Sequence, residues 1–286
     1  MILITGAGGK TGMALTRALV KAESVCAFVR REEHVSMVKS MGAQNVVVGD
    51  MREESAVRSA MEGIRAVYHL CPNMSPDEMV MSKLVIQEAR KAGVEHFVFH
   101  SVLHPQTEKM THHWQKMRVE EMIFESGLSF TILQPAPYMQ NLLAGWKSIV
   151  ADGVLRVPYS IHARFSFIDL EDLAEAARVV LKEPGHFHAI YELTGTEPMS
   201  HADVAKIFEH VISLPVRAEQ EEMRDWRLRT AGLSKYALES LVRMFEYYDK
   251  WGLVGNPTVL KCLLKREPTS METFVQRVLK ERDAIP

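Results

Sequence analysis

The stretch from Thr5 to Gly12 carries the residues with the clearest chemical use, because half of its positions are glycine. It reads Thr-Gly-Ala-Gly-Gly-Lys-Thr-Gly, follows the apolar run 1–4 and leads into a helical pattern over 11–22. In a strand–turn–helix unit, glycines permit a tight turn, a close approach of the backbone to a pyrophosphate and close packing of the helix. The N-terminus of the helix then presents N–H groups to the anion. We expect phosphate contacts from Gly6, Gly8, Gly9, Lys10, Thr11 and Gly12.

Two other interpretations of this stretch compete. Gly9-Lys10-Thr11 resembles the end of a nucleotide-binding P-loop, GxxxxGK[ST], but that motif requires a glycine at the position of Ile4. A plain turn without a ligand would not need four glycines, each of which costs backbone entropy on folding. We therefore favour a cradle for a dinucleotide.

Two arginines after the second predicted strand indicate which dinucleotide is bound. The strand is expected over 24–29, and Arg30-Arg31 follow it with no carboxylate before Glu32. At this place an Asp or Glu binds the ribose 2′-hydroxyl of NAD, whereas an Arg accommodates the 2′-phosphate of NADP. Guanidinium groups bind phosphate through paired hydrogen bonds. We predict NADP(H) as the cofactor, with Lys10 as a third cation at the phosphate; a solvated basic pair is the alternative.

Residues that follow the third and fourth predicted strands are expected to line the same cofactor. They are Gly49, Asp50 and Met51 after the strand 46–48, and Cys71, Pro72 and Asn73 after the strand 66–70. Asp50 is placed to accept from the adenine amino group, or it serves as a helix cap or loop carboxylate. We expect Cys71 to form part of the cofactor wall, since no neighbouring His or cation in the sequence would lower the pKa of its thiol.

A helical stretch over 109–126 contains the candidates for chemistry at the nicotinamide. His112 and Lys116 are four residues apart, so both project from one helix face. A lysine there could bind the nicotinamide ribose or polarise a carbonyl, and a histidine one turn earlier could donate a proton. A half-buried histidine without a chemical role is the alternative. The adjacent histidines point to different faces and no Cys, Asp or Glu completes a ligand spacing, so no metal site is expected.

A stiff turn follows the sixth predicted strand, 130–133. It reads Gln-Pro-Ala-Pro-Tyr-Met-Gln-Asn over 134–141, and two prolines restrict its backbone. We expect Pro135, Tyr138 and Asn141 to contact the cofactor or substrate at the nicotinamide end. Packing of Tyr138 against apolar surface is the alternative.

The order of the predicted elements explains how these residues come together. Strands at 1–4, 24–29, 46–48, 66–70, 97–101 and 130–133 alternate with helical patterns up to residue 126. This alternation predicts an α/β fold with a doubly wound parallel (Rossmann) sheet. Right-handed crossovers place all strand ends at one edge. We therefore expect Gly6, Arg30, Asp50, Cys71 and Ser101 to line one crevice.

The alternation weakens after about residue 142, which suggests a second part of the chain. We expect an NADP-binding domain over 1–150, to which 160–195 adds strands and a helix, and a smaller, mainly helical lobe over 196–286 that caps the substrate. The pattern after Pro215 is helical. Its aromatic residues form either the core of the lobe or a lid over the substrate.

The composition narrows the class of protein. The chain has 286 residues, of which 47% are hydrophobic and 24% charged, and its net charge of −2 gives no general attraction to nucleic acid or to a membrane. Three distant cysteines argue against a disulfide framework. The first predicted strand begins at Met1 and leaves no room for a signal peptide, so we expect a cytoplasmic protein. A homodimer is one option for its oligomeric state.

Taken together, these motifs resemble the NmrA-like group of atypical short-chain dehydrogenases/reductases over roughly residues 1–215. The matching stretches are Thr5–Gly12, Arg30-Arg31, Gly49-Asp50, Ala92–Phe97, His112-x-x-x-Lys116 with Val119–Glu121, Tyr138–Asn141, Phe167–Ala174 and Tyr191–Gly195. The resemblance implies an NADP(H)-binding fold. Members are reductases of quinones, azo compounds, dyes or other aromatic substrates, or cofactor sensors with little catalysis.

The resemblance also assigns roles and shows one departure. The wider superfamily uses Tyr-x-x-x-Lys, and His112 stands here at the position of the tyrosine, while Lys116 is retained where lysine binds the nicotinamide ribose. Ser101 lies where a catalytic serine would end the fifth strand. We predict an NADPH-dependent reductase of a small conjugated acceptor, a substrate that needs little acid catalysis; an NADP(H)-sensing regulator is the alternative.

Overall fold

The computed structural model describes residues 1–283 and divides the chain into two compact units. The first unit comprises Met1–Glu108, His112–Gln134 and Leu173–Tyr191. The second comprises Lys109–Thr111, Pro135–Asp172 and the chain from Glu192 onward.

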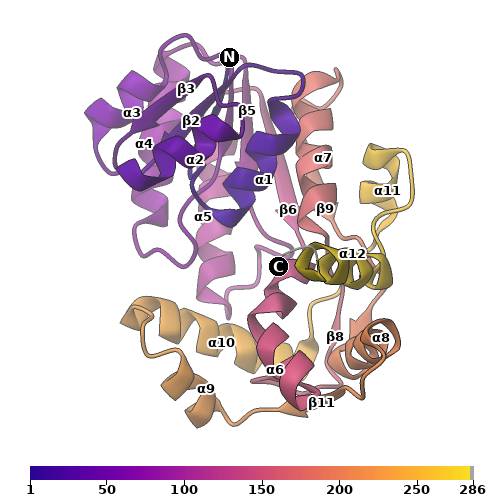
Figure 1. Ribbon diagram of the computed structural model, residues 1–286. Coiled ribbons are helices and arrows are strands. Elements are labelled where there is room, and N and C mark those ends of the chain that lie inside the picture. Colours follow the sequence, from indigo (N-terminus) through magenta and orange to yellow (C-terminus); the bar gives the residue numbers. More distant parts are fainter. Residues whose placement is uncertain (284–286) are drawn as a thin grey trace. The chain divides into compact units, whose positions relative to one another are not determined.

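The first unit is built on a seven-stranded sheet with the order β3-β2-β1-β4-β5-β6-β9 (Figure 1). Its strands are β1 (Ile2–Ile4), β2 (Val25–Val29), β3 (Asn45–Val48), β4 (Ala66–His69), β5 (His96–His100), β6 (Phe130–Pro135) and β9 (Ala189–Leu193). Neighbouring strands from β3 to β6 pair in parallel. The order reverses between β1 and β4, where ligands bind in open α/β sheets. The predicted doubly wound parallel sheet is confirmed.

Helices cover the sheet because its strands are apolar on both faces. They are α1 (Lys10–Leu19), α2 (Val35–Ser40), α3 (Glu54–Ala60), α4 (Glu78–Lys91), α5 (Thr111–Phe124) and α7 (Leu170–Lys182), with a 3-10 turn η1 (Glu32–His34). Leu3, Phe28 and Phe97 pack in one cluster with Val57 of α3 and Val85 of α4. Since strand side chains alternate between faces, a strand buried on both sides reads as a continuous apolar run, as 1–4 does.

The interior of the first unit also contains several histidines. Five are at most 6% exposed: His69, His96, His100, His112 and His113. Burial disfavours the charged imidazolium, and it lowers the pKa of His69 to about 3 and those of His96 and His113 to about 4. Burial likewise holds the pKa values of His100 and His112 well below the usual value. All five are therefore neutral near pH 7.

The second unit is mainly helical and contains two small sheets (Figure 1). Its helices are the 3-10 segment η2 (Met139–Gly145), α6 (Trp146–Asp152), α8 (His201–Ile212), α9 (Met223–Arg229), α10 (Lys235–Trp251), α11 (Thr258–Leu264) and α12 (Met271–Asp283). The strands β7 (Val154–Val157) and β11 (Arg217–Gln220) pair in parallel. The strands β8 (Arg164–Phe165) and β10 (Met199–Ser200) pair antiparallel.

The helical pattern expected directly after Pro215 is wrong at its start, because β11 is a strand. Its sequence Arg-Ala-Glu-Gln is polar and partly exposed. It forms through backbone pairing with β7, and such a short two-stranded ribbon gives no apolar alternation that a sequence could reveal.

The aromatic cluster of the second unit is core packing. The rings of Tyr159 and Phe165 lie 5.3 Å apart, and those of Phe165 and Tyr248 lie 5.2 Å apart and edge to face. Phe165 and Tyr248 are at most 6% exposed. Of the aromatic residues after Pro215, Trp226 and Tyr248 therefore belong to the core of the lobe, whereas Trp251 is 66% exposed.

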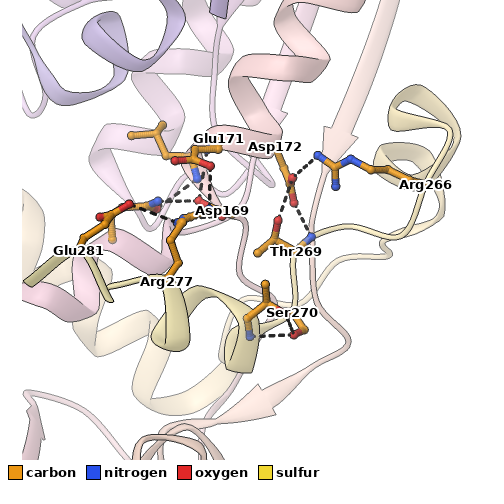
Figure 2. A network of polar contacts seen from close by, with 11 residues as sticks. Asp169, Glu171, Asp172, Arg266, Thr269, Ser270, Arg277 and Glu281 are labelled. Carbon is orange, nitrogen blue, oxygen red and sulfur yellow. Dashed lines mark hydrogen bonds and ion pairs between the residues drawn. The ribbon is translucent and has the colours of Figure 1, made fainter. Parts of the chain in front are cut away.

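Two buried carboxylates hold the C-terminal segment within the second unit (Figure 2). Asp169 is 0% exposed and accepts from Arg277 of α12 at 2.7 Å, and Arg277 also binds Glu171 at 2.7 Å. Asp172 is 1% exposed and accepts from Arg266 and from the backbone N–H of Thr269, at 2.7 and 2.6 Å. These contacts join the start of α7 to the loop and helix at the end of the chain.

Within the part of the chain that the structure describes, no helix is long and apolar enough to cross a membrane.

The buried pair of Asp169 and Arg277 gives a stability prediction. We expect Arg277→Met to lower the free energy of unfolding by about 3 kcal/mol, because it leaves a buried carboxylate without its counter-charge. The exposed pair of Arg118 and Glu121 provides the control, since Arg118→Met should change stability by less than about 1 kcal/mol. Urea unfolding measures both, and equal effects of the two substitutions would contradict the prediction.

The buried histidines predict a loss of stability in acid. Because their pKa is lowered in the folded state, the unfolded chain binds more protons below pH 6.5, so stability falls as the pH drops from about 6.5 toward 4. At pH 5, each such histidine lowers the free energy of unfolding by on the order of 2 kcal/mol relative to neutral pH. Burial raises the pKa values of Glu78 and Glu120, which act in the opposite sense but are fewer.

Urea unfolding at pH 7.5, 6.0 and 5.0 measures this dependence. His96→Gln should reduce the slope of stability against pH by about one proton. The exposed His210 is the control, and His210→Gln should leave the slope unchanged. Stability that is equal at pH 7.5 and pH 5.0 would rule the prediction out.

Candidate functional site

The glycine-rich loop has the geometry of a phosphate cradle. β1 ends at Ile4, Gly6 adopts φ +61°, and the N–H of Gly9 donates to the carbonyl of Gly6 at 3.0 Å. A Cβ at Gly12 would lie 2.4 Å from the Gly6 oxygen and 2.6 Å from the Cα of Ala7. Gly12 is therefore needed for the close approach of α1 to the loop. Gly9 caps this helix, and its first-turn N–H groups, including those of Lys10 and Thr11, have no helical partner.

Gly8 lies against His34, a residue that was not predicted from the sequence as part of the site. A Cβ at Gly8 would lie 2.2 Å from Nδ1 of His34, which belongs to η1 after β2. His34 also contacts Arg31 at 3.2 Å, and Arg31 forms an ion pair with Glu33 at 2.9 Å. His34 thus lies directly over the loop and belongs to the phosphate end of the site. Its position three residues after Arg31 does not by itself show in the sequence that it lies against the loop.

The two predicted arginines differ in their surroundings. Arg31 is engaged by Glu33 and His34, whereas Arg30 is exposed and forms no ion pair within residues 1–283. Lys10 is likewise exposed at the first turn of α1. Of the basic pair, Arg30 is therefore the better candidate for the 2′-phosphate.

Asp50 is a loop carboxylate held by Arg52. Its Oδ1 accepts from the backbone N–H of Arg52 at 2.9 Å, and its Oδ2 accepts from the guanidinium at 2.6 Å. These bonds lower the pKa of Asp50 to about 2. Glu53, not Asp50, occupies the N-cap position of α3, and its side chain makes no capping hydrogen bond. Gly49 is needed for packing, since a Cβ there would lie 2.7 Å from that of Ala56.

Met51 is buried in the core, with 7% of its surface exposed, and packs with Phe28 and Val57. The position therefore offers a ligand its backbone rather than its side chain. The sequence placed Met51 at the cofactor because it follows the third strand, and it could not show which way the side chain turns.

The segment after β4 presents two exposed residues and one engaged thiol. Pro72 and Asn73 are exposed. The Cys71 sulfur lies 3.3 Å from the hydroxyl of Ser82 and 3.5 Å from Nε2 of His69. Burial raises the pKa of Cys71 to about 12, which removes it as a nucleophile near pH 7.

Lys116 and His112 lie in a buried polar cluster that contains an unpredicted carboxylate. Glu78, the first residue of α4, is 0% exposed, and its Oε1 lies 2.6 Å from the ammonium of Lys116. Its Oε2 lies 3.6 Å from Nδ1 of His112. Lys116 also donates to the backbone carbonyl of His100 at 3.0 Å and lies 5.1 Å above the ring centroid of Phe99. The expected pairing of His112 and Lys116 on one helix face is present, with Glu78 facing both.

Ser101 directly follows β5, at the expected strand end, and its side chain is buried. It is 0% exposed, and its hydroxyl donates to the buried carboxylate of Glu120. Glu120 also accepts from Gln134 at 3.0 Å. Ser101 thus contributes to the packing of α5 against the sheet.

Pro135, Tyr138 and Asn141 belong to the second unit. Tyr138 forms a parallel bridge with Ile168, and the N–H of Asn141 donates to the carbonyl of Tyr138 at 2.9 Å. Asn141 is exposed. The structure thus fixes the turn that carries these residues within its own unit.

In the first unit, the predicted residues gather at the ends of parallel strands. The chain leaves β1 at Thr5, whose hydroxyl donates to the carbonyl of Leu70 at 2.9 Å and accepts from its N–H at 2.7 Å. This contact ties the glycine loop to the segment that carries Cys71. Among the described residues, no group of three His, Cys, Asp or Glu side chains has the geometry of a metal site.

Comparison with known proteins identifies similar chains. The chain is 31% identical over 220 residues to the NAD(P)H azoreductase of Xenophilus azovorans, covering 76% of each protein. It is 24% identical over 282 residues to quinone oxidoreductase 2 of Escherichia coli, covering 97% of this chain and 98% of that one.

Solved structures agree with this similarity in fold. The crystal structure of the Escherichia coli quinone oxidoreductase in complex with NADPH superposes with a TM-score of 0.86 at 24% identity, covering 98% of this chain and 100% of that one. A triphenylmethane reductase of Citrobacter sp. superposes with a TM-score of 0.86 at 22% identity, covering 98% and 99%. The profile of the NmrA-like family matches residues 1–275. The expected resemblance is therefore confirmed, and the chain belongs to the NmrA-like family.

Proposed function

We propose that the chain is an NADPH-dependent oxidoreductase that reduces a small conjugated acceptor, such as a quinone or an azo compound, by hydride transfer. One observation carries the proposal. The imidazole that replaces the tyrosine of the wider superfamily, His112, is buried and neutral, and it lies beside a lysine in an ion pair. Similar proteins are named for the reduction of azo compounds and quinones.

The residues of the loop fit a dinucleotide with a 2′-phosphate. Gly6 adopts a positive φ, Gly12 lets α1 approach the loop closely, and Arg30 and Lys10 supply positive charge without ion-pair partners among residues 1–283. A similar protein from Escherichia coli has been crystallised with NADPH. When bound, NADPH supplies the hydride.

The polar cluster favours an acceptor that needs little acid catalysis. A neutral imidazole is a weak proton donor, and the ammonium of Lys116 is already engaged by Glu78. A conjugated acceptor delocalises the charge that arrives with the hydride, whereas a simple ketone requires a proton at its oxygen. The protein then contributes mainly orientation, with Lys116 at the nicotinamide ribose and His112 as an accessory proton donor.

The remaining assignments extend this proposal to the whole chain. The cofactor-binding part corresponds to the first unit rather than to 1–150 with 160–195, because residues 135–172 belong to the second, mainly helical unit. Cys26, Cys71 and Cys262 are free thiols, which fits a reducing compartment such as the cytoplasm. A homodimer stays a prediction.

The position of Arg30 yields a prediction about cofactor choice. We expect Arg30→Asp to weaken NADPH binding about tenfold to a hundredfold and to leave NADH binding nearly unchanged, because charge-assisted phosphate contacts contribute about 1.5–3 kcal/mol. Fluorescence titration with each cofactor measures both dissociation constants. Arg90→Asp, at the exposed last turn of α4, is the control for the change in net charge. An equal loss for both cofactors would show that Arg30 does not read the 2′-phosphate.

The substrate class can be tested with a panel of acceptors. NADPH oxidation should rise above a cofactor-only blank with quinones or azo dyes, and it should stay at the blank with simple ketones and aldehydes. Tight NADPH binding without turnover of any conjugated acceptor would overturn the enzyme proposal in favour of a cofactor-sensing protein.

A further inference from the structure

Glu78 is the one residue of the polar cluster whose burial calls for an explanation beyond the contacts already described. It is 0% exposed and is the first residue of α4, which begins a few residues after the strand-end residues 71–73. Burial raises the pKa of its carboxyl, and the nearby Lys116 opposes this effect. A carboxylate without water is retained only with a counter-charge, and Lys116 at 2.6 Å supplies it.

Two of the groups around Glu78 lie on one face of α5. Lys116 and His112 are one helical turn apart and contact different oxygens of the same carboxylate. The strand ends contribute His69 and the backbone carbonyl of His100, which accepts from Lys116. The Cys71 thiol also lies close, since its sulfur is 3.9 Å from the backbone carbonyl oxygen of Glu78. Of these groups, only Lys116 is a cation near pH 7, because burial keeps the two histidines neutral.

Stability alone does not account for this ion pair. Replacing a buried ion pair by apolar residues of similar volume is often neutral or stabilising, because both charges lose their hydration. The pair does confine the ammonium: one carboxylate oxygen at 2.6 Å, one carbonyl at 3.0 Å and the ring of Phe99 at 5.1 Å surround it. Such contacts restrict a flexible side chain to one place.

We propose that Glu78 is a positioning residue of the cofactor site: its carboxylate holds the Lys116 ammonium where it binds the nicotinamide ribose. The inference rests on the role proposed above for Lys116. Glu78 itself touches neither cofactor nor substrate. It acts by ordering the lysine before the cofactor arrives, so that binding does not have to immobilise the side chain.

A double-mutant cycle on cofactor affinity tests this role. The variants are Glu78→Gln, Lys116→Met and the combination of both, and isothermal titration gives the dissociation constant of NADPH. Each single variant should bind about tenfold more weakly, and the double variant no more weakly than Lys116→Met alone, because coupled residues are not additive. Glu78→Asp keeps the charge and should restore part of the affinity.

The same helix offers a matched control. Glu88 is 3% exposed on α4 and is paired with Arg58 and Lys91, but it lies near the other end of the helix. Glu88→Gln should leave NADPH affinity unchanged. Thermal unfolding of every variant separates binding from folding, and the double variant should be more stable than Glu78→Gln because it leaves no unpaired buried charge.

Three outcomes would overturn the inference: additive losses in the cycle, unchanged affinity in Glu78→Gln, or unchanged affinity in Lys116→Met. The readout is binding, so it is independent of turnover. A wild-type protein that binds NADPH but reduces no acceptor would defeat the proposed reductase activity and leave the role of Glu78 intact.

Discussion

The first unit depends on how closely α1 approaches the turn that follows β1. No side chain fits at Gly12, because a Cβ would collide with the backbone of Gly6 and Ala7. β1 is an interior strand of the sheet and pairs with both β2 and β4, so the place of this turn is fixed by two neighbours. The close contact therefore aims the N-terminus of α1 at the point where the strand order reverses. The cradle is a consequence of packing as much as of phosphate chemistry.

A second constraint is the limited capacity of the interior for charge. The first unit keeps its five buried histidines neutral and buries few ionised groups, among them Glu78 and Lys116, which meet at 2.6 Å. In surroundings without water, the charge of one partner determines where the other can lie. The chemistry available beside the strand ends is therefore that of one fixed ammonium and several neutral imidazoles. Such a set suits the binding and orientation of a reagent better than strong acid catalysis.

The sequence predicted those features that depend on local pattern. Strands buried on both faces give apolar runs, and glycine spacing marks a turn, so both the sheet and the glycine-rich loop could be predicted from the sequence. Features that depend on residues distant in the sequence could not be predicted in this way. Glu78 is the first residue of α4, and nothing in the sequence around it shows that Lys116 will cover it. Likewise, the pattern could not show that Glu33 engages Arg31, or that Ser101 turns toward Glu120. β11 was not predicted because its polar residues do not show the pattern of a strand.

The ion pairs of the second unit have a consequence for the order in which the chain becomes complete. During synthesis Asp169 and Asp172 emerge long before their partners Arg277 and Arg266, which follow near the end of the chain. Until those arginines leave the ribosome, both carboxylates lack the groups that make their burial tolerable, and they must stay hydrated. The second unit can thus close only after Arg277 has left the ribosome. A ribosome that stalls before residue 266 would hold a chain whose second half is still open to proteases and chaperones.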